Sequence, residues 1–410
     1  MSEKLAQAYE LAKSLDALVQ DQKEDSNEFK TILSFLLSYV DQHELVDLFI
    51  FNKLTYFIYK RDHSGSEELF RYSLASLKIK VSNDAIEYAA RSLLFFAANR
   101  DSEFITSSIN KLGEINFSAE ELIYVNFIYG CIEYSKGNYN DYIAKLRLFQ
   151  NRALKTYFKI PASTSNADLL INELATPLAL IAPPVMPKDR LIVICFSCDE
   201  VYFHKYSHFA IESILKTQAK PFISIHIIIE SEGSKELILN KIAKYDNGCI
   251  GVNFTISSGN IRPLSSLVRY LDAFSYSRMG IPIIVADLDS IFLSDLNEIK
   301  GAIPANLIGL RCRRDTCCPW EVYTAGFSYF GANEITIEFL RLYAQYASYI
   351  LDTSYDQWWI DQNCLEASVR HMLIKRNYKF FVDLTPMLDK YIYLPTGSSK
   401  KNISKIFNNI

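Results

Sequence analysis

The feature that most constrains the fold is a regular alternation of apolar runs and amphipathic segments from residue 190 onward. The first run, residues 191–196, reads Leu-Ile-Val-Ile-Cys-Phe without interruption, which is typical of a strand buried on both faces of a sheet. The same pattern predicts further strands at 222–230, 251–256 and 281–286, and helices at 206–217, 234–244 and 264–278. Strands that alternate with helices predict an α/β domain with a mostly parallel sheet.

The first 150 residues have a different pattern, which predicts helices. Proline is absent from residues 1–160, and apolar residues recur at spacings of three and four, as in residues 33–40. Ser118 and Glu121 fit a capping box, and Gly137 then breaks the apolar pattern, so we expect a helical hairpin there. The hairpin resembles one tetratricopeptide unit. A plain helical bundle is the favoured alternative, because no clean second copy follows at a fixed period.

The segment between these two patterns is rich in residues that end helices. Proline stands at Pro183, Pro184 and Pro187, and a turn-rich stretch begins at Pro161. We expect a short helix at 168–180 within this segment. The sequence therefore predicts a helical domain at 1–150, a linker at 151–189 and the α/β domain at 190–410.

Composition excludes some classes of function. The 410 residues carry a formal net charge of −4, whereas a nucleic-acid-binding domain is usually strongly basic. The amino terminus lacks the apolar run of a signal peptide, and no stretch approaches the roughly 20 apolar residues of a membrane span. Without an export signal, the eight cysteines are expected to be reduced thiols. We predict a cytoplasmic protein, with attachment to a membrane surface left open.

An Asp-Leu-Asp motif follows the fourth predicted strand. In open α/β sheets ligands bind at the carboxyl ends of strands, which directs attention to residues 197–199 and 287–289. Alternate residues of an extended segment point the same way, so Asp287 and Asp289 are expected to face one ligand while Leu288 enters the core. Adjacent carboxylates suit a hard divalent cation such as Mg²⁺ or Mn²⁺ that bridges a diphosphate. A solvated surface loop is the alternative.

Four segments along the chain resemble one family in the same order. They are residues 197–202 with 211–215, residues 269–296 around the Asp-Leu-Asp motif, residues 323–327, and residues 359–365. This arrangement resembles the nucleotide-sugar glycosyltransferases of GT-A fold, and most of all the retaining family that includes glycogenin and bacterial lipopolysaccharide hexosyltransferases. The resemblance covers about residues 190–400 and implies a Rossmann-type sheet.

The resemblance also implies roles for individual residues. It implies metal binding by Asp287 and Asp289, donor binding by Ser197, Asp199, Arg269, Thr324, Ala325, Gly326, Gly397 and Lys400, and a place beside the reacting carbon for Asp361 and Gln362. The alternative interpretations are purely structural: Asp199 and Asp361 would start helices, and Arg269 would be a surface charge. The sequence departs from the family at Thr324, where Asn is usual, and at Leu394, where the family has a metal-binding His.

Two other groups of residues carry hypotheses. Arg311, Arg313 and Arg314 crowd into one predicted loop and suit an anionic acceptor, with a solvated turn equally open. The cysteines near Cys312 lack the spacing of zinc ligands, and Cys195 and Cys198 are interpreted as packing thiols. His204, His208 and His226 have no partners that the sequence identifies.

The sequence thus predicts a glycosyltransferase that moves a sugar from a UDP-sugar or similar donor to an acceptor. The expected acceptor is a bacterial glycan or glycoconjugate, and the expected stereochemical outcome is retention, both by resemblance. A sugar-nucleotide hydrolase or nucleotidyltransferase is one alternative. A non-catalytic helical scaffold with a degenerate sugar-nucleotide domain is another, and the helical domain is expected to mediate protein contacts or oligomerisation in either case.

Overall fold

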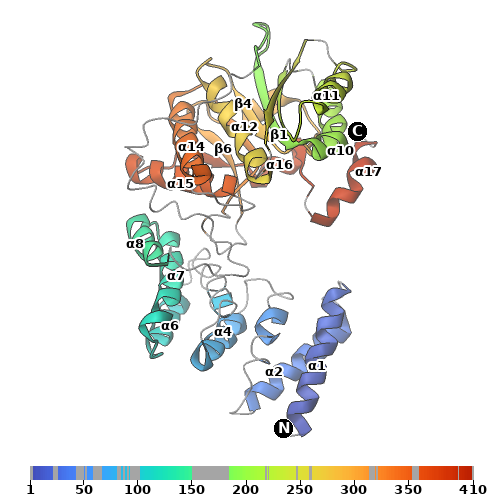
Figure 1. Ribbon diagram of the computed structural model, residues 1–410. Coiled ribbons are helices and arrows are strands. Elements are labelled where there is room, and N and C mark those ends of the chain that lie inside the picture. Colours follow the sequence, from blue (N-terminus) through green and yellow to red (C-terminus); the bar gives the residue numbers. More distant parts are fainter. Residues whose placement is uncertain are drawn as a thin grey trace. The chain divides into compact units, whose positions relative to one another are not determined.

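The computed structural model divides the chain into two compact units (Figure 1). One comprises Met1–Ser165 with Arg314–Pro319, and the other Asn166–Arg313 with Trp320–Ile410. The structure describes residues 3–21, 26–42, 50, 53–58, 67–80, 85, 88–89, 92, 102–149, 184–217, 219, 221–245, 248–257, 261–313, 319, 322–352, 360–395 and 397–408. The helix expected at 168–180 lies outside these residues. Among them, no helix combines the length and apolarity that crossing a membrane requires.

The first unit is helical, as predicted. Its described helices are α1 (Glu3–Gln20), α2 (Asn27–Gln42), α4 (Glu67–Ile79), α6 (Ser102–Gly113), α7 (Ala119–Ser135) and α8 (Tyr139–Phe149). The apolar residues of α2 enter a core with those of α1 and α4, which explains their spacing of three and four.

Helices α7 and α8 form the predicted hairpin. Gly137 lies between them at φ +82°, a backbone conformation that few residues other than glycine adopt. Tyr142 of α8 is buried beside Tyr134 and against Gly130 of α7, where a Cβ atom would lie 3.7 Å from the Tyr142 ring. A Cβ there would make only an ordinary van der Waals contact, so the bulky Tyr142 fits at this position without strain. Whether the hairpin belongs to a tetratricopeptide array stays a prediction.

The second unit is built on a seven-stranded, mostly parallel sheet of order β3-β2-β1-β4-β7-β6-β8. Its strands are β1 (Ile192–Asp199), β2 (Pro221–Ile229), β3 (Ile250–Ile256), β4 (Ile283–Ala286), β6 (Ile308–Cys312), β7 (Tyr323–Phe330) and β8 (Phe381–Asp383). Only β7 runs antiparallel to its two neighbours, β4 and β6. A separate ribbon pairs β5 (Ile291–Phe292) with β9 (Ile392–Tyr393). The prediction of an α/β unit with a mostly parallel sheet is confirmed.

Helices cover both faces of this sheet (Figure 1). One layer contains α12 (Ile261–Ser277), α14 (Glu334–Asp352) and α15 (Ile360–Arg376). The other contains α10 (Glu200–Leu215), α11 (Ser234–Ile242), α13 (Leu296–Ala302) and α16 (Thr385–Tyr391), whose apolar residues join the strands in one core. The chain ends in the 3₁₀ helix η2 (Gly397–Asn402) and α17 (Ile403–Phe407). Because both faces are covered, the strands are apolar throughout, as expected.

One predicted element starts in the wrong place. Helix α10 begins at Glu200, six residues before the predicted start at 206. Asp199 ends β1 and caps the helix, because its carboxylate accepts a hydrogen bond from the Tyr202 amide at 2.7 Å. The strand therefore passes directly into the helix, and residues 200–205, to which the sequence pattern assigned no element, form its first turns.

Candidate functional site

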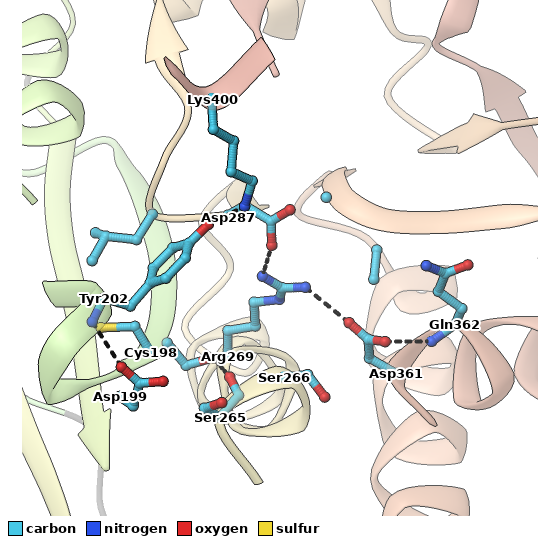
Figure 2. A pocket seen from close by; sticks show the side chains of 14 residues that line it. Cys198, Asp199, Tyr202, Ser265, Ser266, Arg269, Asp287, Asp361, Gln362 and Lys400 are labelled. Carbon is cyan, nitrogen blue, oxygen red and sulfur yellow. Dashed lines mark hydrogen bonds and ion pairs between the residues drawn. The ribbon is translucent and has the colours of Figure 1, made fainter. Parts of the chain in front are cut away.

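A pocket lies at the carboxyl ends of β1 and β4, the edge that the parallel sheet predicts. Its lining residues are Ser197, Cys198, Asp199, Tyr202, Ser265, Ser266, Arg269, Asp287, Leu288, Ala325, Gly326, Asp361, Gln362 and Lys400 (Figure 2). They come from six separate stretches of the chain. The cavity has a volume of about 200 Å³, which is less than the roughly 300 to 1,000 Å³ of typical small-molecule sites.

The Asp-Leu-Asp motif forms the turn that follows β4. The amide of Asp287 donates to the Gly326 carbonyl at 3.1 Å, and the Ser290 amide donates to the Asp287 carbonyl at 3.1 Å. Leu288 is buried in the core, as predicted, whereas the Asp287 side chain is 44% exposed. A Cβ on Gly326 would lie only 3.0 Å from the Asp287 carboxylate, so the glycine leaves that carboxylate its space.

Arg269 joins two of the predicted carboxylates. Its guanidinium donates to Asp287 and, at 3.0 Å, to Asp361 in the first turn of α15 (Figure 2). Burial alone would lower the pKa of Arg269, but the two carboxylates raise it overall, so the side chain stays charged. The surface-charge alternative for Arg269 does not fit its burial.

Asp361 is a buried carboxylate with an elevated pKa. Burial raises its pKa to about 6, although Arg269 opposes the shift. Its second oxygen accepts a hydrogen bond from the Gln362 amide at 2.9 Å. Asp361 therefore lies in the first turn of α15 and also lines the pocket, and its role beside a reacting carbon stays a prediction.

Asp289 lies beneath a lysine and a tyrosine. The Lys400 ammonium is 2.6 Å from its carboxylate, and the Tyr202 hydroxyl donates to the same oxygen. Burial is the main reason that the pKa of Asp289 is raised, and the nearby Asp287 adds to it against Lys400 and Tyr202. Burial and Asp289 together raise the pKa of Tyr202, so its hydroxyl remains protonated.

Of four other residues predicted to bind the donor, two line the pocket and two are not among its described lining residues. Ser197 lines the pocket, but its hydroxyl donates to the Ser265 carbonyl and ties β1 to α12. Thr324 is not among the described lining residues, and its hydroxyl donates to the Arg311 carbonyl at 3.4 Å. Ala325 lines the pocket, and Gly397 begins η2 three residues before Lys400.

Sequence reasoning gave no role to some of the lining residues. Tyr202 lies in a segment that carried the resemblance, yet its contact with Asp289 spans 87 residues of sequence. Ser265 and Ser266 lie three or four residues before Arg269, and helical periodicity around Arg269 was a signal that could have found them.

The structure also places other residues that the sequence singled out, and it corrects the prediction for Arg311. Arg311 belongs to β6 rather than to a loop, and Arg314 lies outside the described residues. His226 does have partners, because its ring contacts buried Asp272 at 3.2 Å and Thr255 at 2.8 Å. Leu394 packs against the core of the α/β unit.

The cysteines that the structure describes behave as packing thiols. Cys195 and Cys198 are buried and free, and burial raises the pKa of both thiols, which disfavours metal-binding thiolates.

The carboxylate oxygens at the pocket have the negative charge that a divalent cation needs, but few of them are placed to bind one. Among the described residues at the pocket, four carboxylates (Asp199, Asp287, Asp289 and Asp361) outnumber three cations (Arg269, Arg311 and Lys400). Carboxylate oxygens are ligands that Mg²⁺ and Mn²⁺ accept, and Mg²⁺ usually keeps several waters. Within the described part of the chain, no group of three His, Cys, Asp or Glu side chains is arranged to hold a metal. A cation here would have two protein ligands and water.

Comparison with known proteins gives distant structural similarities only. No protein-family model matches the sequence, and no curated protein matches it. Mouse xyloside xylosyltransferase 1 in its apo form is similar at 14% identity and a TM-score of 0.28, over 48% of this chain and 84% of that chain. The bifunctional glycosyltransferase WbbM is similar at 15% identity and a TM-score of 0.30, over 76% of this chain and 60% of that chain. At these TM-scores the similarity carries no argument about function.

Proposed function

We propose that the α/β unit is a glycosyltransferase that uses a nucleoside-diphosphate sugar, with a UDP-sugar as the expected donor. The observation that carries this proposal is the meeting of Asp287, Arg269, Asp361 and Lys400 in one pocket at the carboxyl ends of β1 and β4. These groups come from distant stretches of sequence, and each matches a residue to which the family resemblance assigns a role. A solvated surface loop would not pair them in this way.

A divalent cation is part of the proposal. Because the carboxylates at the pocket outnumber the cations, the side chains alone would repel a diphosphate, and Mn²⁺ or Mg²⁺ held by Asp287 and Asp289 would reverse that repulsion. When bound, the cation would act as a Lewis acid that stabilises the negative charge of the departing diphosphate. Water completes its coordination, because Leu394 offers no ligand.

The side chains of the pocket would stabilise the charges that develop when the sugar is transferred. The bond between the anomeric carbon and the diphosphate oxygen breaks, and its electron pair leaves with the nucleoside diphosphate. The Lys400 ammonium neutralises charge on that diphosphate. Asp361 and Gln362 lie beside the carbon that gains positive charge, where a buried carboxylate and an amide dipole stabilise it. The acceptor hydroxyl oxygen then bonds to this carbon and gives up its proton to the departing diphosphate oxygen, with retention expected from the resemblance alone.

The acceptor is proposed to be a glycan or glycoconjugate that carries negative charge. Arg311 supports this idea, because its guanidinium lies 4.0 Å from the position that a Gly326 Cβ would occupy at the pocket wall. An arginine there suits a phosphate or carboxylate group of the acceptor. The proposal places the reaction in the cytoplasm, and gives the helical domain at 1–150, joined by the linker at 151–189, a role in contacts with protein partners.

A second candidate is a binding protein whose sugar-nucleotide domain has lost activity. The specific observation in its favour is that Asp289 is already neutralised by Lys400, while Leu394 replaces the third metal ligand. The two candidates predict different responses to the same ligands.

A donor panel separates them. We expect one UDP- or GDP-sugar to raise the melting temperature in the presence of Mn²⁺ and to release its nucleotide when a suitable acceptor is added. Binding without turnover on any acceptor would favour the binding protein. Absence of binding to every sugar nucleotide, with and without metal, would contradict both candidates. Release without an acceptor at a rate matching that with one would identify a hydrolase.

A further inference from the structure

Lys400 forms an ion pair with Asp289, one of the two carboxylates that the proposed function assigns to the metal. Its ammonium lies 2.6 Å from Asp289 and 2.5 Å from the Tyr202 hydroxyl, and 4.9 Å from the centre of the Tyr202 ring. Figure 2 shows the side chain extending toward Tyr202 above the Arg269 guanidinium. The oxygen of Asp289 that contacts Lys400 also accepts a hydrogen bond from Tyr202, so this oxygen already has two partners.

The chain around Lys400 is held by apolar packing. Lys400 belongs to η2, and α17 follows it directly. Ile403 is buried beside Tyr206 and Phe209 of α10, and the Phe407 ring lies 5.3 Å from that of Phe209. This packing fixes the backbone, while the lysine side chain keeps four rotatable bonds. The ammonium can therefore move without displacement of the segment that carries it.

A divalent cation at Asp289 would compete with Lys400 for the negative charge of one carboxylate. The Asp289 side chain is only 2% exposed, so a cation bound there would lie close to the ammonium with little water between them. The cavity of about 200 Å³ is also smaller than the roughly 300 Å³ at which typical ligand sites begin. Movement of Lys400 would both free the carboxylate and enlarge the cavity.

We propose that Lys400 is a built-in competitor of the divalent cation at Asp289, and that the diphosphate relieves the competition. Without ligands the ammonium holds Asp289; when metal and nucleotide are bound, it contacts the diphosphate, and Tyr202 stays on Asp289 as a positioning residue. This inference rests on the proposed function. Metal alone leaves two cations close together in a half-buried site, whereas the diphosphate places an anion between them. Metal and nucleotide therefore bind cooperatively, with Lys400 as the source of the coupling.

The test compares Mn²⁺ binding with and without nucleotide. Free Mn²⁺ is measured by its electron paramagnetic resonance signal in titrations of the full chain, first alone and then with UDP. In Lys400→Met, Mn²⁺ alone should bind about tenfold tighter than in the wild type, and the gain in Mn²⁺ affinity caused by UDP should shrink by about tenfold or more. If Lys400 made only a structural contact, its loss would instead weaken the binding of Mn²⁺ both with and without UDP.

Two further variants serve as controls. Lys405→Met removes an exposed lysine of α17 and should behave as the wild type. Lys400→Arg keeps the positive charge and should keep the weak binding of Mn²⁺ alone, which also covers the case in which Lys400→Met fails to fold.

The outcomes separate this inference from the proposed function. Unchanged or weaker Mn²⁺ binding in Lys400→Met, or no Mn²⁺ binding in either protein, would overturn the competition. Tighter Mn²⁺ binding in that variant, with no effect of UDP or GDP on any form, would support the competition at Asp289 while contradicting the sugar-nucleotide function and the coupling. Tighter binding together with a reduced effect of UDP supports both.

Discussion

The Arg269 guanidinium and the Asp361 carboxylate form an ion pair at 3.0 Å that joins α12 to the first turn of α15. Their residues are 4% and 5% exposed, so neither charge has water as an alternative partner. The pair fixes two helices of the same layer against each other beside the pocket. It therefore links the stability of the α/β unit to the geometry of the site.

Replacement of Arg269 by methionine should destabilise this unit strongly. Removal of one partner leaves the Asp361 charge buried and unpaired, which typically reduces the free energy of unfolding by about 3 kcal/mol or more. The double variant Arg269→Met with Asp361→Asn should recover part of that loss, because the remaining group is neutral. Urea unfolding of the single and double variants measures the coupling. Strictly additive losses would show that the pair has no energetic role.

Asp361 should also make stability depend on pH. Its pKa in the folded protein is about 6, above the ordinary 3.8, because burial disfavours the charged form. The folded state therefore binds the proton more tightly than the unfolded chain, and stability falls as pH rises between about 4 and about 6. A shift of this size corresponds to about 3 kcal/mol in total. Above pH 6 the contribution is constant.

The variant Asp361→Asn isolates this effect. The free energy of unfolding is measured by urea titration from pH 4.5 to about pH 7.5 for both proteins, and the difference is plotted against pH. The wild type should lose stability relative to the variant as pH approaches 6. A flat difference curve would mean that Asp361 titrates near its ordinary pKa, and that Arg269 cancels the effect of burial.

Gly326 should contribute to ligand binding by leaving space for the Asp287 carboxylate. In Gly326→Ala the new Cβ would lie 3.0 Å from the Asp287 carboxylate and would push it from its position. We expect Mn²⁺ and UDP to bind about tenfold more weakly, as a loss of roughly 1.4 kcal/mol, with little change in the unfolding midpoint. Isothermal titration calorimetry provides the affinities.

Gly301→Ala is the matched control for that substitution. Gly301 lies in α13, and a Cβ there would meet nothing within 4 Å. The alanine should leave the affinities unchanged and slightly increase stability, because alanine is the better helix former. Equal effects of the two substitutions on binding would argue against a steric role for Gly326.

The sheet could be predicted from sequence because its strands are buried on both faces, so that runs such as residues 191–196 and 281–286 contain only apolar residues. The ends of the strands then located Asp287 and Asp199 by a general rule of open sheets. The apolar pattern placed the start of α10 too late, because Glu200, Val201 and Tyr202 do not form an apolar face that marks a helix. The alternative interpretation of Asp199 as a helix start was correct, since Asp199 caps α10.

The contacts inside the pocket were harder to predict. Lys400 and Tyr202 are separated by 198 residues, and their hydrogen bond exists because α17 packs on α10. The apolar residues that cause this packing, such as Phe407, give no sign of their partner in sequence. The contact between His226 and Asp272 could not be predicted for the same reason, because it forms only where a strand and a helix pack together. The boundaries of the domains and the role of the helical unit stay predictions.

The last prediction concerns Asp289 itself. Asp289→Asn removes the negative charge that would hold a divalent cation and keeps the size of the side chain. Stabilisation by Mn²⁺ should disappear, because a cation that no longer binds the folded state cannot raise the melting temperature. Asp389→Asn, an exposed substitution on α16, should retain the full Mn²⁺ shift. The measurement is a thermal melt with and without Mn²⁺ and UDP. An intact shift in Asp289→Asn would place the metal elsewhere and remove the reason for Lys400 and the cation to compete.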